Sequence, residues 1–341
     1  MPMPVKTLAD RLLEADALVF AREDPQRPFH YAVVETLKGD PGDAPIDAFL
    51  PSVDRRVLAQ FPHRHMLLAR PDPAGGWSAL GIADADYERV VRRILDHATS
   101  WRPMETDNSQ RLAEFVPLLG HRDSRLHELA YLEIGRAPYA EIRRIAATVP
   151  IETVRGMLDE PRYLEWRSLA ILMLAESGRP ADWQRIRRTF DDKQRLGSTF
   201  NLAAWATAYI AIEGASGVER IQRWYLTQPD RSLKELREIL TALSVVAAAD
   251  ASLQEPVAAA YRALLDVHPS LAPDVSRDLI AWRRWDFAEQ IRGIRSVVPK
   301  QHPLAVDALG LYLRSAARAS SSDLEIPDHP ETGPTPNGVT R

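Results

Sequence analysis

Before Asp84, apolar and polar positions alternate in short segments with the two-residue period of a β-strand. Turn-forming clusters such as DPQRP, LKGDPGDAP and PDPAGG separate these segments. The predicted strands cover residues 17–23, 29–38, 46–50, 65–70 and 77–82. Helical spacing appears at 5–16 and 52–61. The pattern predicts a small α+β domain whose strands suffice for a β-barrel-like or sandwich-like sheet.

Residues 84–101 form the clearest amphipathic helix of the chain. Tyr87, Val91, Ile94 and Leu95 share one face, which is too apolar to leave in water. No Gly/Ser-rich linker separates this segment from the helices that begin near Asn108. We therefore expect the helix to join the β-rich domain to the next part of the chain by obligatory docking.

Beyond Asn108 nearly all apolar positions follow the helical period, and a layout of two helices with a short break between them recurs. It reads LAYLEIGRAPYAEIRRI, AILMLAESGRPADWQRI and AAWATAYIAIEGASGVERI, with weaker copies later. Four anchors of the second helix, spaced 35, 36 and 34 residues apart, are Ile186, Ile221, Val257 and Ile291. A period in this range indicates stacked helical hairpins, which bury their apolar faces against one another.

The paired helices, with Pro, Gly or Asp between them and aliphatic first helices such as ILMLA, resemble HEAT-type repeats over roughly residues 108–315. The resemblance implies an α-solenoid of four to six hairpins that holds a partner on its surface. The fold class expected is mostly α, an α-solenoid preceded by the small β-barrel-like domain. The expected domains are residues 1–103, the repeat array of 104–319 and a disordered tail of 320–341, which is polar and Pro-rich.

The opening segment LADRLLEADALVFARE, followed by a hairpin and VVETLKGD, is similar to the start of netrin-like (tissue-inhibitor-like) modules. That resemblance implies an OB-type barrel of a family that is usually exported. The family opens with cysteines, whereas this chain contains none, so no inhibitory mechanism carries over. The absence of cysteine also excludes disulfides, thiolate catalysis and Cys-ligated zinc.

Composition narrows the class of protein. The 341 residues carry a formal net charge of −4, which argues against a general nucleic-acid-binding protein. The preference for Arg over Lys is typical of a GC-rich, bacterial coding sequence. No stretch approaches the roughly 20 apolar residues of a membrane span, and no secretory signal is visible. As written, the chain is expected to be cytoplasmic, or periplasmic or secreted if a signal peptide precedes Met1.

Sequence motifs for catalysis are missing. There is no phosphate loop, nucleophile elbow, H-E-x-x-H motif or dinucleotide fingerprint. The carboxylate pairs Asp10/Glu14 and Asp191/Asp192 are expected to be solvated, and the His63–His65 pair lacks a third metal ligand. We therefore expect no enzyme activity, no metal and no cofactor.

Two sets of residues are candidates for binding. The basic set follows the second-helix anchors and would form a ridge in a stacked array, broken at Ala258 and Ala259. Its members are Arg143, Arg144, Arg187, Arg188, Arg223 and Arg292. The aromatic pair Trp205 and Tyr209 lies one helical turn apart, where packing between repeats is the ordinary interpretation and ligand stacking the alternative.

These features favour a non-enzymatic protein-binding or scaffold protein whose partner is another protein. The alternative is a HEAT-like factor, possibly an enzyme, that binds nucleic acid or phosphate through the Arg ridge. The identity of the partner and the oligomeric state stay open.

Overall fold

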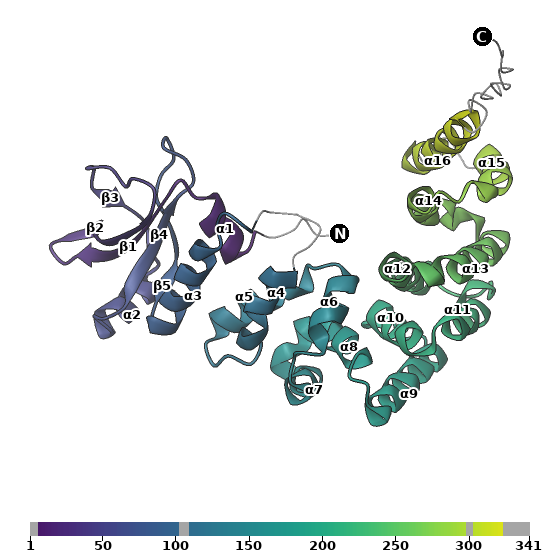
Figure 1. Cartoon of the computed structure of the whole chain (residues 1–341), viewed down its shortest axis with the longest axis horizontal. Coiled ribbons are helices and arrows are strands. Elements are labelled where there is room, and N and C mark those ends of the chain that lie inside the picture. The colour runs from purple at the N-terminus through teal and green to yellow at the C-terminus, as the bar shows by residue number, and fades with distance from the viewer. Residues whose placement is uncertain (1–5, 102–108, 298–302, 323–341) are drawn as a thin grey trace, which may run out of the picture. The chain divides into compact units, whose positions relative to one another are not determined.

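The computed structural model describes residues 6–101, 109–297 and 303–322 of the chain (Figure 1). These residues form sixteen α-helices and five β-strands, which confirms a mostly helical protein with a small N-terminal sheet. The chain divides into two compact units, Met1–Ser177 and Gly178–Arg341. The expected boundary at 103/104 lies outside the described residues. None of the described helices has the length and apolar character needed to cross a membrane.

The sheet of the first unit is antiparallel and open. Its strand order is β3-β2-β1-β4-β5. The strands are β1 (Ala17–Asp24), β2 (Arg27–Lys38), β3 (Ile46–Asp47), β4 (His65–Arg70) and β5 (Ser78–Ala83). Closure into a barrel requires the two edge strands to pair, but β3 is only two residues long and pairs with β2 alone. The expectation of a β-barrel-like sheet is therefore wrong.

Both faces of the sheet are covered in part. Helix α2 (Ser52–Gln60) contributes Val57 and Leu58 to a core with one face of β1 and β4, which includes Val19 and Met66. On the opposite face, helix α3 (Ala85–Asp96) contacts β5 and helix α1 (Leu8–Glu14), and Arg92 of α3 lies over the Phe20 ring of β1. Because both faces are covered, consecutive residues of β1 and β4 are buried, Ala17–Ala21 and Met66–Ala69.

Helix α3 is shorter than the expected 84–101. Asp84 caps it, since its carboxylate accepts a hydrogen bond from the Tyr87 amide at 3.1 Å. The helix ends at Asp96, and His97 begins a turn. Tyr87, Val91 and Ile94 are buried, as their shared face predicts.

Five further helices complete the first unit. They are α4 (Ser109–Phe115), α5 (Ser124–Gly135), α6 (Tyr139–Ala146), α7 (Ile151–Asp159) and α8 (Arg167–Ala175). Helix α4 contacts α5 and α6, and α8 contacts α6 and α7. The sheet and these helices are held together by direct contacts: Arg93 of α3 forms an ion pair with Glu114 of α4, and Trp101 packs on Phe115.

A buried group of charged side chains attaches α1 to α4 and α5. Arg111 donates hydrogen bonds to Asp10 and to Glu133, each at 2.9 Å, and Thr7 donates to Glu133. Arg136 forms ion pairs with both carboxylates. The expectation that Asp10 is a solvated member of a surface pair is therefore wrong, because partners far along the chain enclose it.

The second unit contains helices in two rows (Figure 1). They are α9 (Pro180–Leu196), α10 (Leu202–Glu213), α11 (Ala215–Ile221), α12 (Leu233–Ala249), α13 (Gln254–Val267), α14 (Ala272–Ala281), α15 (Ala288–Val297) and α16 (Pro303–Ser322). Helices α10, α12, α14 and α16 contact one another in sequence, and α11 contacts α13 in the other row. All four predicted anchors are fully buried, in α9, α11, α13 and α15: Ile186, Ile221, Val257 and Ile291.

Hydrogen bonds between successive helix pairs join residues about one repeat apart. The Ala203 amide donates to Glu238, 35 residues away, and Ser244 donates to Asp278, 34 residues away. These separations match the spacing of the buried anchors. At the end of the described chain, α16 extends through Ser322, so residues 320–322 are helical and not part of a disordered tail. The rest of the expected tail, 323–341, lies outside the described residues.

Candidate functional site

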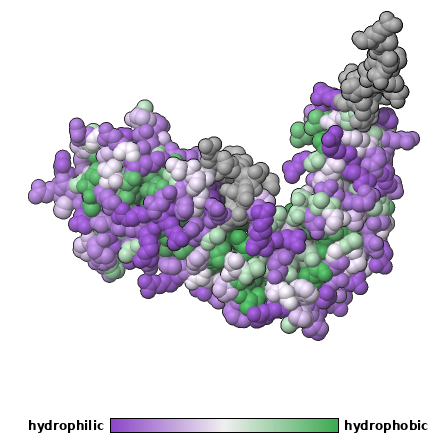
Figure 2. Space-filling model, viewed as in Figure 1, coloured by the Kyte–Doolittle hydropathy of each residue, from purple (hydrophilic) through white to green (hydrophobic). Residues whose placement is uncertain are grey.

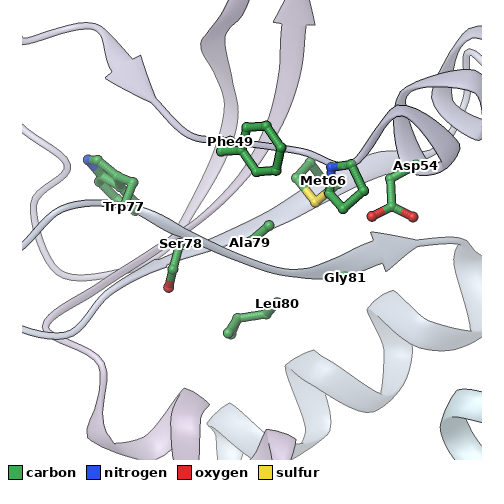
Figure 3. A pocket seen from close by; sticks show the side chains of 9 residues that line it. Phe49, Asp54, Met66, Trp77, Ser78, Ala79, Leu80 and Gly81 are labelled. Carbon is green, nitrogen blue, oxygen red and sulfur yellow. The ribbon is translucent and has the colours of Figure 1, made fainter.

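A cavity of about 440 Å³ lies beside strand β5 of the first unit (Figure 3). Its lining comes from the segment before and within α2, from β4 and from β5. The lining residues are Phe49, Pro51, Asp54, Met66, Trp77, Ser78, Ala79, Leu80 and Gly81. The cavity is thus bounded mainly by apolar and aromatic groups, with a single carboxylate.

The cavity follows the edge of β5 and not only one of its faces. Successive side chains of a strand point to opposite faces of the sheet. Nevertheless all residues from Trp77 to Gly81 border the cavity. A space that consecutive strand residues share must lie along the backbone of that strand.

The outer side of β5 has no strand partner among the described residues. β5 pairs with β4 alone, in the register Met66 with Ile82 and Leu68 with Ala79. Near the end of the strand, the Arg125 guanidinium donates to the Ile82 carbonyl and so covers that part of the edge. The preceding residues of β5 keep an open edge, where backbone N–H and C=O groups are available for another strand.

A β-bulge shapes this edge. The pairing shifts between Leu67 and Leu68, which leaves Leu80 as an extra residue between Ala79 and Gly81. Gly81 has φ +154°, and a Cβ atom at this position would lie 3.2 Å from the Tyr87 hydroxyl oxygen. Both the backbone conformation and the close approach of α3 therefore require glycine here.

The exposed ring of Phe49 borders the cavity and is supported by Phe29. The Phe49 side chain is 78% exposed and its ring stacks on Phe29, with centroids 5.9 Å apart. Phe29 is held in turn by the Arg55 guanidinium, 4.7 Å from the ring centroid, and Arg55 pairs with Glu23 at 3.0 Å. Phe29 has φ +68°, which is strained for a residue with a side chain, and such strain is concentrated at functional sites.

Trp77 directly precedes β5, and Arg70 of β4 holds its ring in position. The Arg70 guanidinium lies 5.4 Å from the Trp77 ring centroid. Arg70 itself donates to Asp16 at 3.0 Å and to the Asp40 carbonyl at 2.7 Å. An indole held in this way is a pre-organised contact surface.

Several large apolar side chains of the sheet and of the segment around α2 are exposed to solvent. Figure 2 shows hydrophobic residues over the sheet of the first unit, bordered by hydrophilic ones. The large exposed apolar side chains in the strands and the segment around α2 are Phe29, Val33, Val34, Phe49 and Val53. Contiguous exposed apolar surface marks an interaction site, and Phe49 is the member of this set that also lines the cavity.

The Arg residues that the sequence singled out are divided between the two compact units. Arg143 and Arg144 lie on α6 of the first unit and pair with Glu176 at 3.1 Å and Glu141 at 2.8 Å. The other four lie in the second unit, where Arg187 pairs with Glu213. The remaining members are exposed and form no ion pair with any described residue: Arg188, Arg223 and Arg292.

Trp205 and Tyr209 lie in the interior of the second unit. They are 8% and 1% exposed in α10. The Tyr209 ring stacks on Phe190 at 4.6 Å, and its hydroxyl accepts a hydrogen bond from Arg220 at 2.7 Å. Both rings therefore pack in the interior of the second unit. Neither of them lines the cavity at β5.

Within the described parts of the chain, no group of three or more His, Asp or Glu side chains is arranged to hold a metal ion. His65 Nδ1 donates a hydrogen bond to a Glu88 carboxylate oxygen at 2.8 Å, and its Nε2 accepts one from the Arg22 guanidinium at 3.3 Å. His65 is thus engaged in local contacts between β4, α3 and β1. Comparisons of the chain with protein-family models, with curated proteins and with solved structures found no match.

Sequence reasoning missed the site at β5. Trp77 and Phe49 belong to patterns that predict strands, and strand residues are ordinarily expected in the core. The available signal was the turn PDPAGG directly before Trp77, which places a large aromatic ring at the start of a strand. The exposure of Phe49 follows from the path of the chain between β3 and α2 and has no local signature.

Proposed function

We propose that the protein is a non-enzymatic binding protein that recognises an extended segment of a partner protein by β-strand addition at β5. The observation that carries the proposal is the edge from Ser78 to Gly81, which is unpaired on its outer side among the described residues and borders an aromatic-lined cavity. In this mode of recognition, main-chain hydrogen bonds supply affinity and pockets for alternate side chains supply specificity.

The geometry suits a peptide of short length. Residues of an added strand would point alternately toward the cavity and away from it. Those that face the cavity would contact Phe49 and Trp77, which are held in position by Phe29 and Arg70. The site therefore needs little ordering of its own side chains on binding, which favours affinity.

For the helical part we propose a HEAT-like α-solenoid that serves as a scaffold. Two rows of helices and hydrogen bonds spaced by 34 and 35 residues support this proposal for the second unit. Stacked repeats of this kind expose long surfaces for protein partners.

The alternative, nucleic-acid or phosphate binding through the Arg set, has weaker support. Within this set only Arg188, Arg223 and Arg292 are exposed and form no ion pair with a described residue, and the chain is acidic overall. Binding of DNA or RNA that weakens steeply with salt, and that is lost when these three residues are replaced by Glu, would favour this alternative instead.

The proposed function is tested with a phage-displayed library of random nonapeptides selected on the full-length protein. Selected sequences are synthesised with N-methyl groups at odd or at even positions, and their affinities are measured by fluorescence polarisation. Strand addition predicts that one methylated series loses binding and the other retains it, because only alternate amides of the peptide face β5. Equal tolerance of both series, or failure to select any peptide, would contradict the proposal.

A further inference from the structure

The single carboxylate in the cavity lining belongs to Asp54. It lies in the first turn of α2 and is half-buried. In Figure 3, Trp77 and Asp54 appear at the two ends of the labelled lining, with Phe49 and Met66 between them. The cavity thus combines an aromatic region with one negative charge.

No described side chain forms an ion pair with Asp54. The neighbouring Arg55 is directed to Glu23, at 3.0 Å, and to the Phe29 ring. The carboxylate therefore has no positively charged partner among the described side chains. Its position near the start of α2 is favourable for the helix dipole, but it does not replace a counter-ion.

A strand added along β5 would remove water from this carboxylate. Desolvation of an ionised group is costly unless the incoming group compensates its charge. A cationic side chain on the bound segment would do so, whereas an anionic one would add repulsion. The Asp54 carboxylate would therefore favour segments with a cationic side chain and disfavour segments with an anionic one.

We propose that the β5 edge selects extended segments that carry a Lys or Arg two residues away from an apolar or aromatic residue. Since residues two apart in a strand lie on one face, the apolar side chain would contact Phe49 and Trp77 while the cation pairs with Asp54. This proposal rests on strand addition as the mode of binding and specifies the partner as a basic, apolar strand segment.

The test uses full-length protein and two defined peptide sets, measured by fluorescence polarisation. Both sets are nonapeptides with aromatic and aliphatic residues at alternate positions. One set has Lys or Arg at the central cavity-facing position, and the other has Glu there. Three proteins are compared: the parent, Asp54→Asn and, as a control of equal charge change, Asp43→Asn, at an exposed residue outside the cavity.

We expect the basic set to bind the parent about tenfold more tightly than the acidic set, a ratio typical of one partly desolvated charge pair. Asp54→Asn should reduce this ratio to nearly one, while Asp43→Asn should preserve it. The difference between the sets should also shrink with rising salt. These four results together would support the assignment of Asp54.

Two outcomes would overturn the inference, and they are distinguishable. If peptides bind with the alternating N-methyl pattern but show no preference for Lys or Arg, strand addition stands and the role of Asp54 is wrong. If neither set binds and the protein instead forms dimers that Leu80→Lys disrupts, a second copy occupies the edge, and both the inference and the proposed function are wrong.

Discussion

Arg111 and Asp10 form an ion pair, with 2.9 Å between a guanidinium nitrogen and a carboxylate oxygen, across 101 positions of sequence. Their side chains are 4% and 9% exposed. Glu133, at 1% side-chain exposure, accepts two further hydrogen bonds from Arg111. The three residues come from α1, α4 and α5, so this group determines how the first helix attaches to the helical part of the first unit.

Replacement of Arg111 by Ala should destabilise the first unit by about 3 kcal/mol, because buried Asp10 and Glu133 would lose a shared counter-ion. Hydrogen exchange measured by mass spectrometry should show faster exchange in α1 and α5. Peptides from α12 and α13 serve as an internal reference and should not change. The control is Arg122→Ala, since the Arg122 side chain is 90% exposed and its pairing with Asp86 contributes little. Unchanged protection of α1 in Arg111→Ala would contradict this role.

The ion pairs of Asp10 with Arg111 and Arg136 predict that the stability of the protein depends on pH. Burial raises the pKa of Asp10, but hydrogen bonds from Arg136 and Arg111 outweigh it and hold this pKa well below the usual value of 3.8. A lowered pKa in the folded state stabilises the protein above the unfolded pKa, and this contribution is lost as the pH falls through the folded value.

Urea denaturation of the parent and of Asp10→Asn from pH 7 to pH 2 measures this contribution. The difference in free energy of unfolding should be constant above about pH 5, and should decrease progressively below about pH 4, where the unfolded carboxyl becomes protonated. A difference that stays constant over the whole range would show that Asp10 has no lowered pKa.

Gly81→Ala should destabilise the first unit by about 1–3 kcal/mol, because alanine at φ +154° is strained and its Cβ would meet the Tyr87 hydroxyl at 3.2 Å. Gly76→Ala is the matched control, since a Cβ there meets no atom within 4 Å. Its effect should stay within about 0.5 kcal/mol. Thermal unfolding followed by circular dichroism compares the two variants, and equal melting temperatures would argue against strain at the β5 bulge.

Phe49→Ala should weaken peptide binding about five- to thirtyfold, the effect of an aromatic contact worth about 1–2 kcal/mol. Its stability should change little, because the side chain is 78% exposed in the free protein. Leu164→Ala is the control, as Leu164 is 49% exposed and does not line the cavity. Fluorescence polarisation with a selected nonapeptide gives both affinities. A variant that binds like the parent would remove Phe49 from the site.

The sequence by itself determined the secondary structure and its periodicity. Alternation placed β1, β2, β4 and β5 within about two residues of their observed bounds, and the helical period identified four anchors that are fully buried. These features are local, since the side-chain direction along a strand or helix follows from backbone geometry alone. The HEAT-like assignment depends on the same periodicity and stays a prediction.

The tertiary structure alone decided which polar groups are buried and where the sheet stays open. The sequence predicts that Asp10 is a solvated carboxylate. In the structure, α4 and α5 place Arg111 and Glu133 beside it. The β5 edge is open because β3 is too short to close the sheet, which no property of the β5 sequence reveals. The burial of a polar group and the exposure of a strand edge depend on contacts between segments distant in sequence, and the local pattern does not specify which distant segments meet.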